Sequence, residues 1–146
     1  MSSEPGRILA IDLGQARIGL ALSDPLGITA QPLETLQRVG PRRDLQTLAE
    51  RVQAAEACTV VVGLPRLMSG EEGTQARHAR EFAQRLGRRI PGVRVVFWDE
   101  RLTTVQAERT MISGKVRRAR RRRIVDGLAA VLILQGFLDR RSEADP

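Results

Sequence analysis

The stretch Arg7-Ile8-Leu9-Ala10-Ile11-Asp12-Leu13-Gly14 is an almost unbroken run of apolar residues that a glycine closes. This composition is typical of a strand that is buried on both faces of a sheet, because neither face then needs polar side chains for water. We therefore expect residues 7–13 to form the central strand. Asp12 is the only charged residue between Ile8 and Gly14. A carboxylate in such a strand needs compensation, which makes Asp12 the first candidate functional residue.

The segments that follow favour two more strands, antiparallel to the first. Gly14-Gln15-Ala16-Arg17 resembles a hairpin connection into residues 18–23. Asp24-Pro25-Leu26-Gly27 predicts a second turn, because Pro fixes φ and Gly can take a positive φ, and it leads into a strand around residues 28–36.

The pattern then alternates between helix and strand. Such crossover units imply parallel pairing with the first strand. The expected elements are a helix at 44–57, a strand at 59–63, a helix at 73–86, a strand at 93–98, a short helix around 104–112, an arginine-dense loop, and a C-terminal helix from about 124 to 138. Together they predict an α/β fold with a mixed five-stranded sheet, three strands antiparallel and then two parallel, flanked by helices.

Length and charge limit the classes of protein that fit. A chain of 146 residues has room for one domain with a hydrophobic core, expected to span residues 1–146. Its net charge of +7 favours polyanionic partners, and nucleic acid is the first to consider. The longest apolar stretch, 128–134, is far short of the ~20 residues of a spanning helix. Because residues 1–6 also lack the plan of a signal peptide, we expect a cytoplasmic protein without membrane contact.

The chain has one cysteine and one histidine, so any metal must be held mainly by oxygen ligands. Cys58 has no cysteine partner for an intramolecular disulfide and is expected to be a small buried residue. His78 is expected to be an ordinary residue of the second helix. The carboxylates therefore become the candidates for chemistry.

Three positions carry candidate carboxylates, and each has an alternative explanation. Asp12 can bind a metal or simply initiate the turn at Gly14, and Gly14 itself can serve the hairpin or let a phosphate approach the backbone. Asp99 and Glu100 follow a predicted strand, and because side chains alternate, only one of them can point in the same direction as Asp12. Spacing does not choose between them. Asp126 is predicted in the first turn of the last helix, where the helix dipole alone favours a carboxylate by ~0.3–1 kcal/mol.

Taken together, these carboxylates fit the hydrolysis of phosphodiester bonds. Three acidic side chains at the edges of buried elements can bind Mg²⁺ or Mn²⁺, the ions that such hydrolysis uses. A basic run directly precedes Asp126, and we expect its arginines to contact phosphates, although a solvated loop is the alternative. These are Arg117, Arg118, Arg120, Arg121, Arg122 and Arg123.

Four segments, in order and across nearly the whole chain, carry a resemblance to a known family. They are Ile11-Asp12-Leu13-Gly14 with Arg17-Ile18-Gly19, Val62-Gly63-Leu64-Pro65 followed by Gly70, Asp99-Glu100-Arg101-Leu102-Thr103-Thr104, and Val125-Asp126 with Ala129-Ala130-Val131-Leu132-Ile133-Leu134-Gln135. In them the sequence resembles the YqgF/RuvX family of Holliday-junction-resolvase-like proteins. The resemblance implies a ribonuclease H-like fold and selects Glu100 over Asp99 as the metal-facing acid beside Asp12 and Asp126. Family members usually carry a lysine just before the last acid, where this chain has arginines.

The resemblance implies a nuclease, with two substrates open. The family has been linked to resolving four-way DNA junctions and to trimming the 5′ end of precursor 16S ribosomal RNA. Resolution needs two symmetric cuts and hence a homodimer, whereas a monomer suffices for trimming. The alternatives are a non-catalytic RNA-binding or ribosome-assembly factor, which predicts a missing carboxylate, and an actin-like phosphotransferase, which needs two domains.

Overall fold

The computed structural model describes residues 6–102 and 118–144, and within the second range it describes the side chains of residues 128–141. The described residues form a five-stranded sheet with the order β3-β2-β1-β4-β5. The first three strands pair antiparallel, and β4 and β5 continue the sheet in parallel from β1. The predicted mixed sheet is therefore confirmed. The strands are β1 (Arg7–Leu13), β2 (Arg17–Ser23), β3 (Ala30–Gln37), β4 (Ala57–Leu64) and β5 (Arg94–Asp99).

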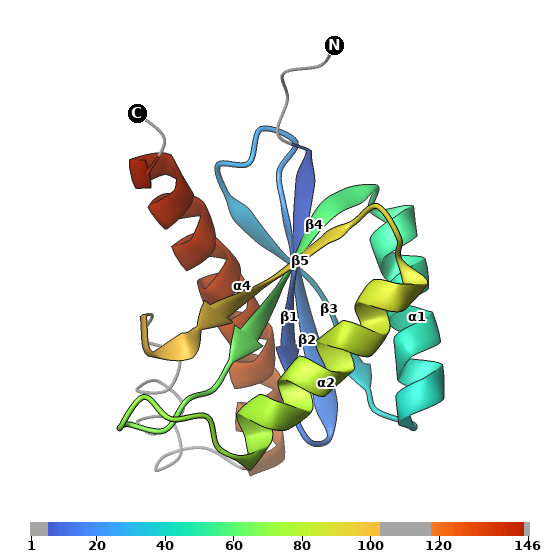
Figure 1. The fold of residues 1–146 in the computed structure, drawn as a ribbon, viewed down its shortest axis with the longest axis vertical. Coiled ribbons are helices and arrows are strands. Elements are labelled where there is room, and N and C mark those ends of the chain that lie inside the picture. The colour runs from blue at the N-terminus through green and yellow to red at the C-terminus, as the bar shows by residue number, and fades with distance from the viewer. Residues whose placement is uncertain (1–5, 103–117, 145–146) are drawn as a thin grey trace.

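Helices cover both faces of this sheet. On one face lie α1 (Pro41–Ala54) and α2 (Thr74–Arg89), and on the other lies α4 (Arg118–Ala144), as Figure 1 shows. A short 3₁₀ turn, η1 (Glu100–Leu102), follows β5 directly. Ile133 of α4 lies against Gly63 near the end of β4, and Arg141, farther along the helix, lies near Gly27 in the turn before β3. The N-terminal part of α4 therefore lies toward the end of the sheet where β1 and β4 end.

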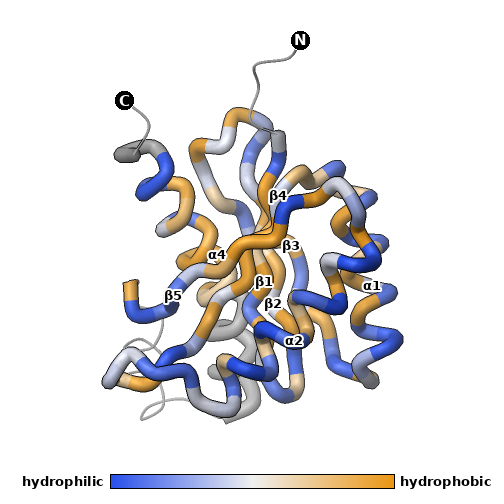
Figure 2. Tube along the Cα trace, viewed as in Figure 1, coloured by the Kyte–Doolittle hydropathy of each residue, from blue (hydrophilic) through white to orange (hydrophobic). Residues whose placement is uncertain are grey.

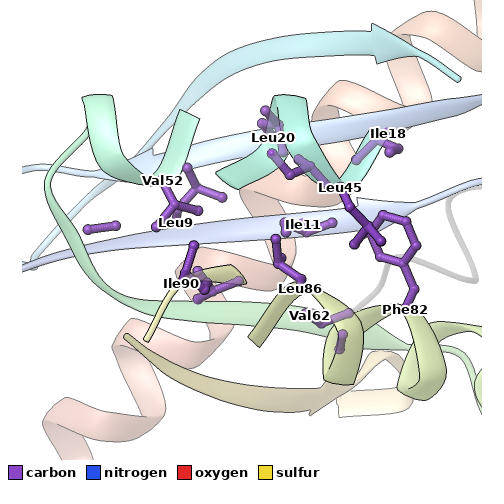
Figure 3. Packing of buried hydrophobic residues seen from close by; sticks show 14 residues of the cluster. Leu9, Ile11, Ile18, Leu20, Leu45, Val52, Val62, Phe82, Leu86 and Ile90 are labelled. Carbon is purple, nitrogen blue, oxygen red and sulfur yellow. The ribbon is translucent and has the colours of Figure 1, made fainter. Parts of the chain in front are cut away.

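Alternation along β1 divides its side chains between two hydrophobic clusters. Leu9 and Ile11 pack with residues of α1 and α2, as Figure 3 shows. Ile8 and Ala10 pack against α4. Figure 2 shows hydrophobic segments of the strands at the centre of the molecule. β1 is therefore buried on both faces, as its composition predicts.

The first helix begins and ends earlier than the expected range 44–57. Pro41 starts it, and a proline suits this position because its fixed φ is helical and the missing N–H has no partner there. Glu56 has a φ of 54°, which stops the helix, and β4 begins at the next residue. Asp44 lies in the first turn and accepts a hydrogen bond from the Val39 N–H at 3.0 Å.

The last helix differs most from expectation, because α4 begins at Arg118 and not near residue 124. Residues 118–123 are therefore helical, and the expected arginine-dense loop is wrong for them. Arginine is a good helix former, and like-charge pairs four residues apart cost only a few tenths of a kcal/mol each. Arg117 and the expected helix at 104–112 lie outside the described residues. Despite the length of α4, no helix in the described ranges is long and apolar enough to cross a membrane.

Cys58 is exposed, so the expectation of a buried cysteine is wrong. The pairing of β1 with β4 shifts there: Arg7 pairs with Ala57, but Ile8 pairs with Thr59. Cys58 is the extra residue of this bulge, and a bulge interrupts the alternation of side chains between the two faces. Its thiol lies 3.5 Å from the carbonyl oxygen of Arg7.

Candidate functional site

A cavity of about 460 Å³ opens at the end of β1 and brings two of the predicted carboxylates together. Asp12 reaches it from β1, and Glu100 reaches it from the turn after β5. Their exposed fractions are only 3% and 1%. The cavity is lined by Asp12, Leu13, Gly14, Gln15, Ala16, Arg17, Arg38, Pro65, Gln75, His78 and Glu100.

The sheet register fixes the direction of Asp12. Even-numbered residues of β1, such as Ile8 and Ala10, face α4, and Asp12 continues this series because side chains alternate along a strand. Ile11 pairs with Val62 in parallel register, so the next residues along the two strands are Asp12 and Gly63. Asp12 therefore lies beside a position that has no side chain.

Gly63 provides the space that Glu100 occupies. A Cβ atom at this position would lie 2.9 Å from Glu100 Oε1 and 2.6 Å from Ile133 Cδ1. Both distances are shorter than ordinary van der Waals contact of 3.4–4 Å. The absent side chain thus allows the Glu100 carboxylate to lie over β4, next to Asp12 on β1.

Asp99 is used differently from its neighbour. It accepts hydrogen bonds from Arg101 Nη2 at 2.7 Å and from the Arg101 backbone N–H at 2.9 Å, and Arg66 Nε lies 3.9 Å away. The hydrogen bonds from the Arg101 side chain hold the pKa of Asp99 below its ordinary value. The structure therefore places Glu100, and not Asp99, on the cavity, a choice that spacing alone left open.

The third predicted acid, Asp126, lies well inside α4, although its side chain is not among those described. The helix-dipole explanation weakens for it, because that effect is confined to the first turn. Helical spacing puts position 126 on the same stripe as Ala129, Ala130 and Ile133, which are buried against the sheet. Its role as a metal ligand stays a prediction. The same holds for the phosphate contacts of the arginine run, Arg117, Arg118, Arg120, Arg121, Arg122 and Arg123.

Several residues that line the cavity were not predicted. Arg17 and Arg38 come from the start of β2 and the segment after β3, and Gln75 and His78 come from α2. His78 was expected to be an ordinary helix residue, but it faces this cavity. The three-residue spacing of Gln75 and His78 puts them on one side of α2, and this was the only signal for them in the sequence.

A network of ion pairs holds the loop between β4 and α2 at the edge of the cavity. Arg80 Nη2 donates to Glu72 Oε2 at 2.8 Å, and Arg66 lies 3.7 Å from the same oxygen. The hydrogen bond from Arg80 keeps the pKa of Glu72 below its ordinary value. Arg66 also pairs with Asp99, so these ion pairs connect the loop to the end of β5. Pro65 of this loop lines the cavity.

The donor set at the cavity fits a hard divalent cation. Asp12 and Glu100 offer carboxylate oxygens, which Mg²⁺ and Mn²⁺ prefer. Within the described ranges, no group of three or more His, Cys, Asp or Glu residues is placed to hold a metal. The side chain of the third expected ligand, Asp126, is not among the described side chains.

Comparison with a solved structure identifies the fold. The chain is similar to "T. thermophilus RuvC in complex with Holliday junction substrate", with a TM-score of 0.59 and 16% identity over 94% of this chain and 96% of that one. At this identity the similarity concerns the fold alone. The predicted ribonuclease H-like fold is confirmed.

Sequence comparison identifies the family. A protein of Nocardia farcinica named "Putative pre-16S rRNA nuclease" is 50% identical over 94% of this chain and 79% of its own length. A protein of the same name from Carboxydothermus hydrogenoformans is 42% identical over 94% of this chain and 99% of its own. The family model RuvX, described as "Holliday junction resolvase", matches residues 6–140. The chain therefore belongs to the RuvX (YqgF) family.

Proposed function

We propose that this chain is a cytoplasmic, metal-dependent endonuclease that hydrolyses phosphodiester bonds in structured nucleic acid. The observation that carries the proposal is the pair of almost completely buried carboxylates, Asp12 and Glu100, on one cavity. The net charge of +7 supports a polyanionic substrate. The names of the relatives support a nuclease.

Asp12, Glu100 and Asp126 would hold Mg²⁺ or Mn²⁺ in this site. When bound, such an ion lowers the pKa of a water molecule and stabilises charge on the leaving oxygen. The protein's own contribution is rigid placement of the ligands. Asp12 is fixed within a central strand, and Glu100 is buried in the space above Gly63. In the reaction the water oxygen forms a bond to phosphorus, the bond from phosphorus to the ester oxygen breaks, and that oxygen takes up a proton.

Two substrates fit the proposal, and precursor 16S ribosomal RNA is the first to test. The relatives at 42% and 50% identity are named for it. The family model is instead described by the Holliday junction, a four-way DNA substrate. Symmetric cutting of a junction requires two active sites related by a twofold axis, so a junction resolvase of this chain would be a homodimer.

The test compares cleavage of labelled precursor 16S 5′-end RNA and of a labelled four-way DNA junction, with Mg²⁺, with Mn²⁺ and with EDTA. We expect metal-dependent cleavage of at least one substrate. The variants Asp12→Asn, Glu100→Gln and Asp126→Asn should each abolish it. Thermal unfolding of each variant shows whether a lost activity reflects a lost fold.

Asp99→Asn is the matched control, because Asp99 directly precedes Glu100 in the chain but its carboxylate pairs with Arg101. This variant should still cleave. Cleavage that survives in Asp12→Asn and Glu100→Gln would refute the assignment of the site. If the wild-type protein binds both nucleic acids and cuts neither in any metal, the chain is a binding or ribosome-assembly factor that retains the fold.

A further inference from the structure

Two arginines far apart in the sequence line the cavity beside the carboxylates. Arg17 begins β2, and Arg38 directly follows β3. Backbone hydrogen bonds hold their segments together: the Gly14 N–H donates to the Arg17 carbonyl at 2.9 Å, and the Arg38 N–H donates to the Ala16 carbonyl at 3.0 Å. The turn after Asp12 and the end of β3 therefore form one wall of the cavity.

The guanidinium group of Arg38 is held in place by three contacts. Its Nε donates to Asp44 Oδ2 at 3.3 Å, its Nη1 donates to the Gly14 carbonyl at 3.0 Å, and the group lies 5.5 Å from the centroid of the Phe82 ring. Asp44 is itself only 4% exposed and is also bound by the Val39 N–H, so this support is rigid. A guanidinium has five N–H donors, and these bonds use two of them. Within the described residues the other three make no hydrogen bond, and Arg38 lines the cavity.

Arg17 offers a second donor. Its Nε atom is buried and has no hydrogen-bond partner among the described residues. Buried polar groups are normally hydrogen-bonded, so this N–H lacks the partner that such a group usually has, and Arg17 also lines the cavity. Asp44 offsets the charge of Arg38, but no ion pair of Arg17 occurs within the described residues. The arginine pair therefore keeps a net positive charge.

We propose that Arg17 and Arg38 bind a backbone phosphate of the nucleic acid next to the phosphate that is cleaved. Two guanidinium groups, one of them fixed, suit the oxygens of a phosphodiester, because arginine binds such oxygens in bidentate geometry. The carboxylate side of the cavity would repel this phosphate, whereas the arginine side attracts it. Asp44 acts as a positioning residue for Arg38. This proposal rests on the nuclease function proposed above.

The test measures binding without cleavage. A fluorescent four-way DNA junction and a fluorescent precursor 16S 5′-end RNA are titrated in EDTA at several salt concentrations with the wild type, Arg17→Gln and Arg38→Gln. Each variant should lower affinity roughly tenfold and reduce the dependence of log K on log salt by about one contact. A separate titration with inorganic phosphate should shift the NMR signals of the Arg17 and Arg38 Nε–H groups.

Arg94→Gln is the matched control, because Arg94 is exposed at the start of β5, at the opposite end of that strand from Asp99. Its affinity and salt dependence should equal those of the wild type. Arg38→Gln also removes the hydrogen bonds to Asp44 and Gly14, and their loss could disturb the fold locally. Arg17→Gln breaks no side-chain hydrogen bond within the described residues, so a loss of binding in this variant reports on the phosphate site alone. Asp44→Asn should weaken binding less than Arg38→Gln does and leave the Arg17 signal responsive to phosphate.

The outcomes separate this proposal from the nuclease. If Arg17→Gln and Arg38→Gln bind like Arg94→Gln, and phosphate shifts neither arginine signal, the phosphate site is refuted even when the protein cleaves normally. If both variants lose affinity and salt dependence, the site is supported even when no metal gives cleavage.

Discussion

Adding one methyl group at Gly63 should expose how tightly the site is packed. In Gly63→Ala the new Cβ would lie 2.6 Å from Ile133 Cδ1, against ordinary contacts of 3.4–4 Å. One of the two groups must therefore move by roughly an ångström, and overpacking of this kind costs about 1–3 kcal/mol. The lower backbone entropy of the unfolded alanine chain offsets ~0.4–1 kcal/mol of that cost. We expect a net loss of about 1–2 kcal/mol, which lowers Tm by roughly 2–8 °C for a chain of this size.

A second substitution separates the two contacts of this methyl group. Ile133→Val removes the Cδ1 atom and by itself costs ~0.5–1.5 kcal/mol. In the double variant the alanine methyl occupies the space that Cδ1 left, so the two costs should not add. Glu100 Oε1 still lies 2.9 Å from the new methyl group. Gly63→Ala and the double variant should therefore cleave more slowly than the wild type, whereas Ile133→Val should cleave at a rate near that of the wild type.

The assay is a double-mutant cycle in urea, with cleavage measured on the same four proteins. We expect a coupling energy of about 1 kcal/mol or more, where independent sites add to within ~0.5 kcal/mol. Additive losses would show that Gly63 and Ile133 are not in contact. Full cleavage by the double variant would show that Glu100 does not depend on the space above Gly63.

Three further predictions concern stability and surface chemistry. Arg101 lowers the pKa of Asp99 in the folded protein, so Asp99 stabilises the fold above the unfolded-state pKa of ~3.9, and this stabilisation is lost as the pH falls through the lower folded pKa. In urea unfolding below about pH 5, the free energy of unfolding should therefore fall more steeply with decreasing pH in the wild type than in Asp99→Asn, and equal slopes of the two proteins would contradict this. Gly14→Ala would bring a Cβ to 2.8 Å from the Arg17 carbonyl oxygen, and because backbone cannot rotate away as a side chain can, we expect a clear fall in Tm, whereas an unchanged Tm would argue against this hairpin geometry. Exposed Cys58 should react with a thiol reagent such as Ellman's reagent in the native protein, and a reaction seen only in denaturant would place it in the interior.

The strands of this fold could be predicted because their signal is local. The apolar run of residues 7–13 matches β1 residue for residue, and its lack of alternation already indicated burial on both faces. The limits of α4 were harder to predict. Good helix formers at 118–123 carry like charges, and the sequence does not show whether the weak repulsion or the helix propensity prevails.

The carboxylate pair was only partly predictable, for a geometric reason. Alternation of side chains assumes that Asp99 and Glu100 lie in the same strand, but β5 ends at Asp99 and Glu100 begins a 3₁₀ turn. The rule therefore could not choose between them, although the family resemblance did. The exposure of Cys58 also depends on tertiary structure, because Cys58 lies in a bulge that forms only when β4 pairs with β1.

The sequence by itself determined the mixed sheet, the central position of Asp12 and the basic charge, since these depend on composition and on spacing between near neighbours. Only the tertiary structure could show that Arg17, Arg38 and His78 share a cavity with Asp12 and Glu100. Their segments are far apart in the chain, and they meet because the turn after β1, the end of β3 and the start of α2 converge at one end of the sheet. Such convergence depends on the packing of the whole chain and leaves no local pattern in the sequence.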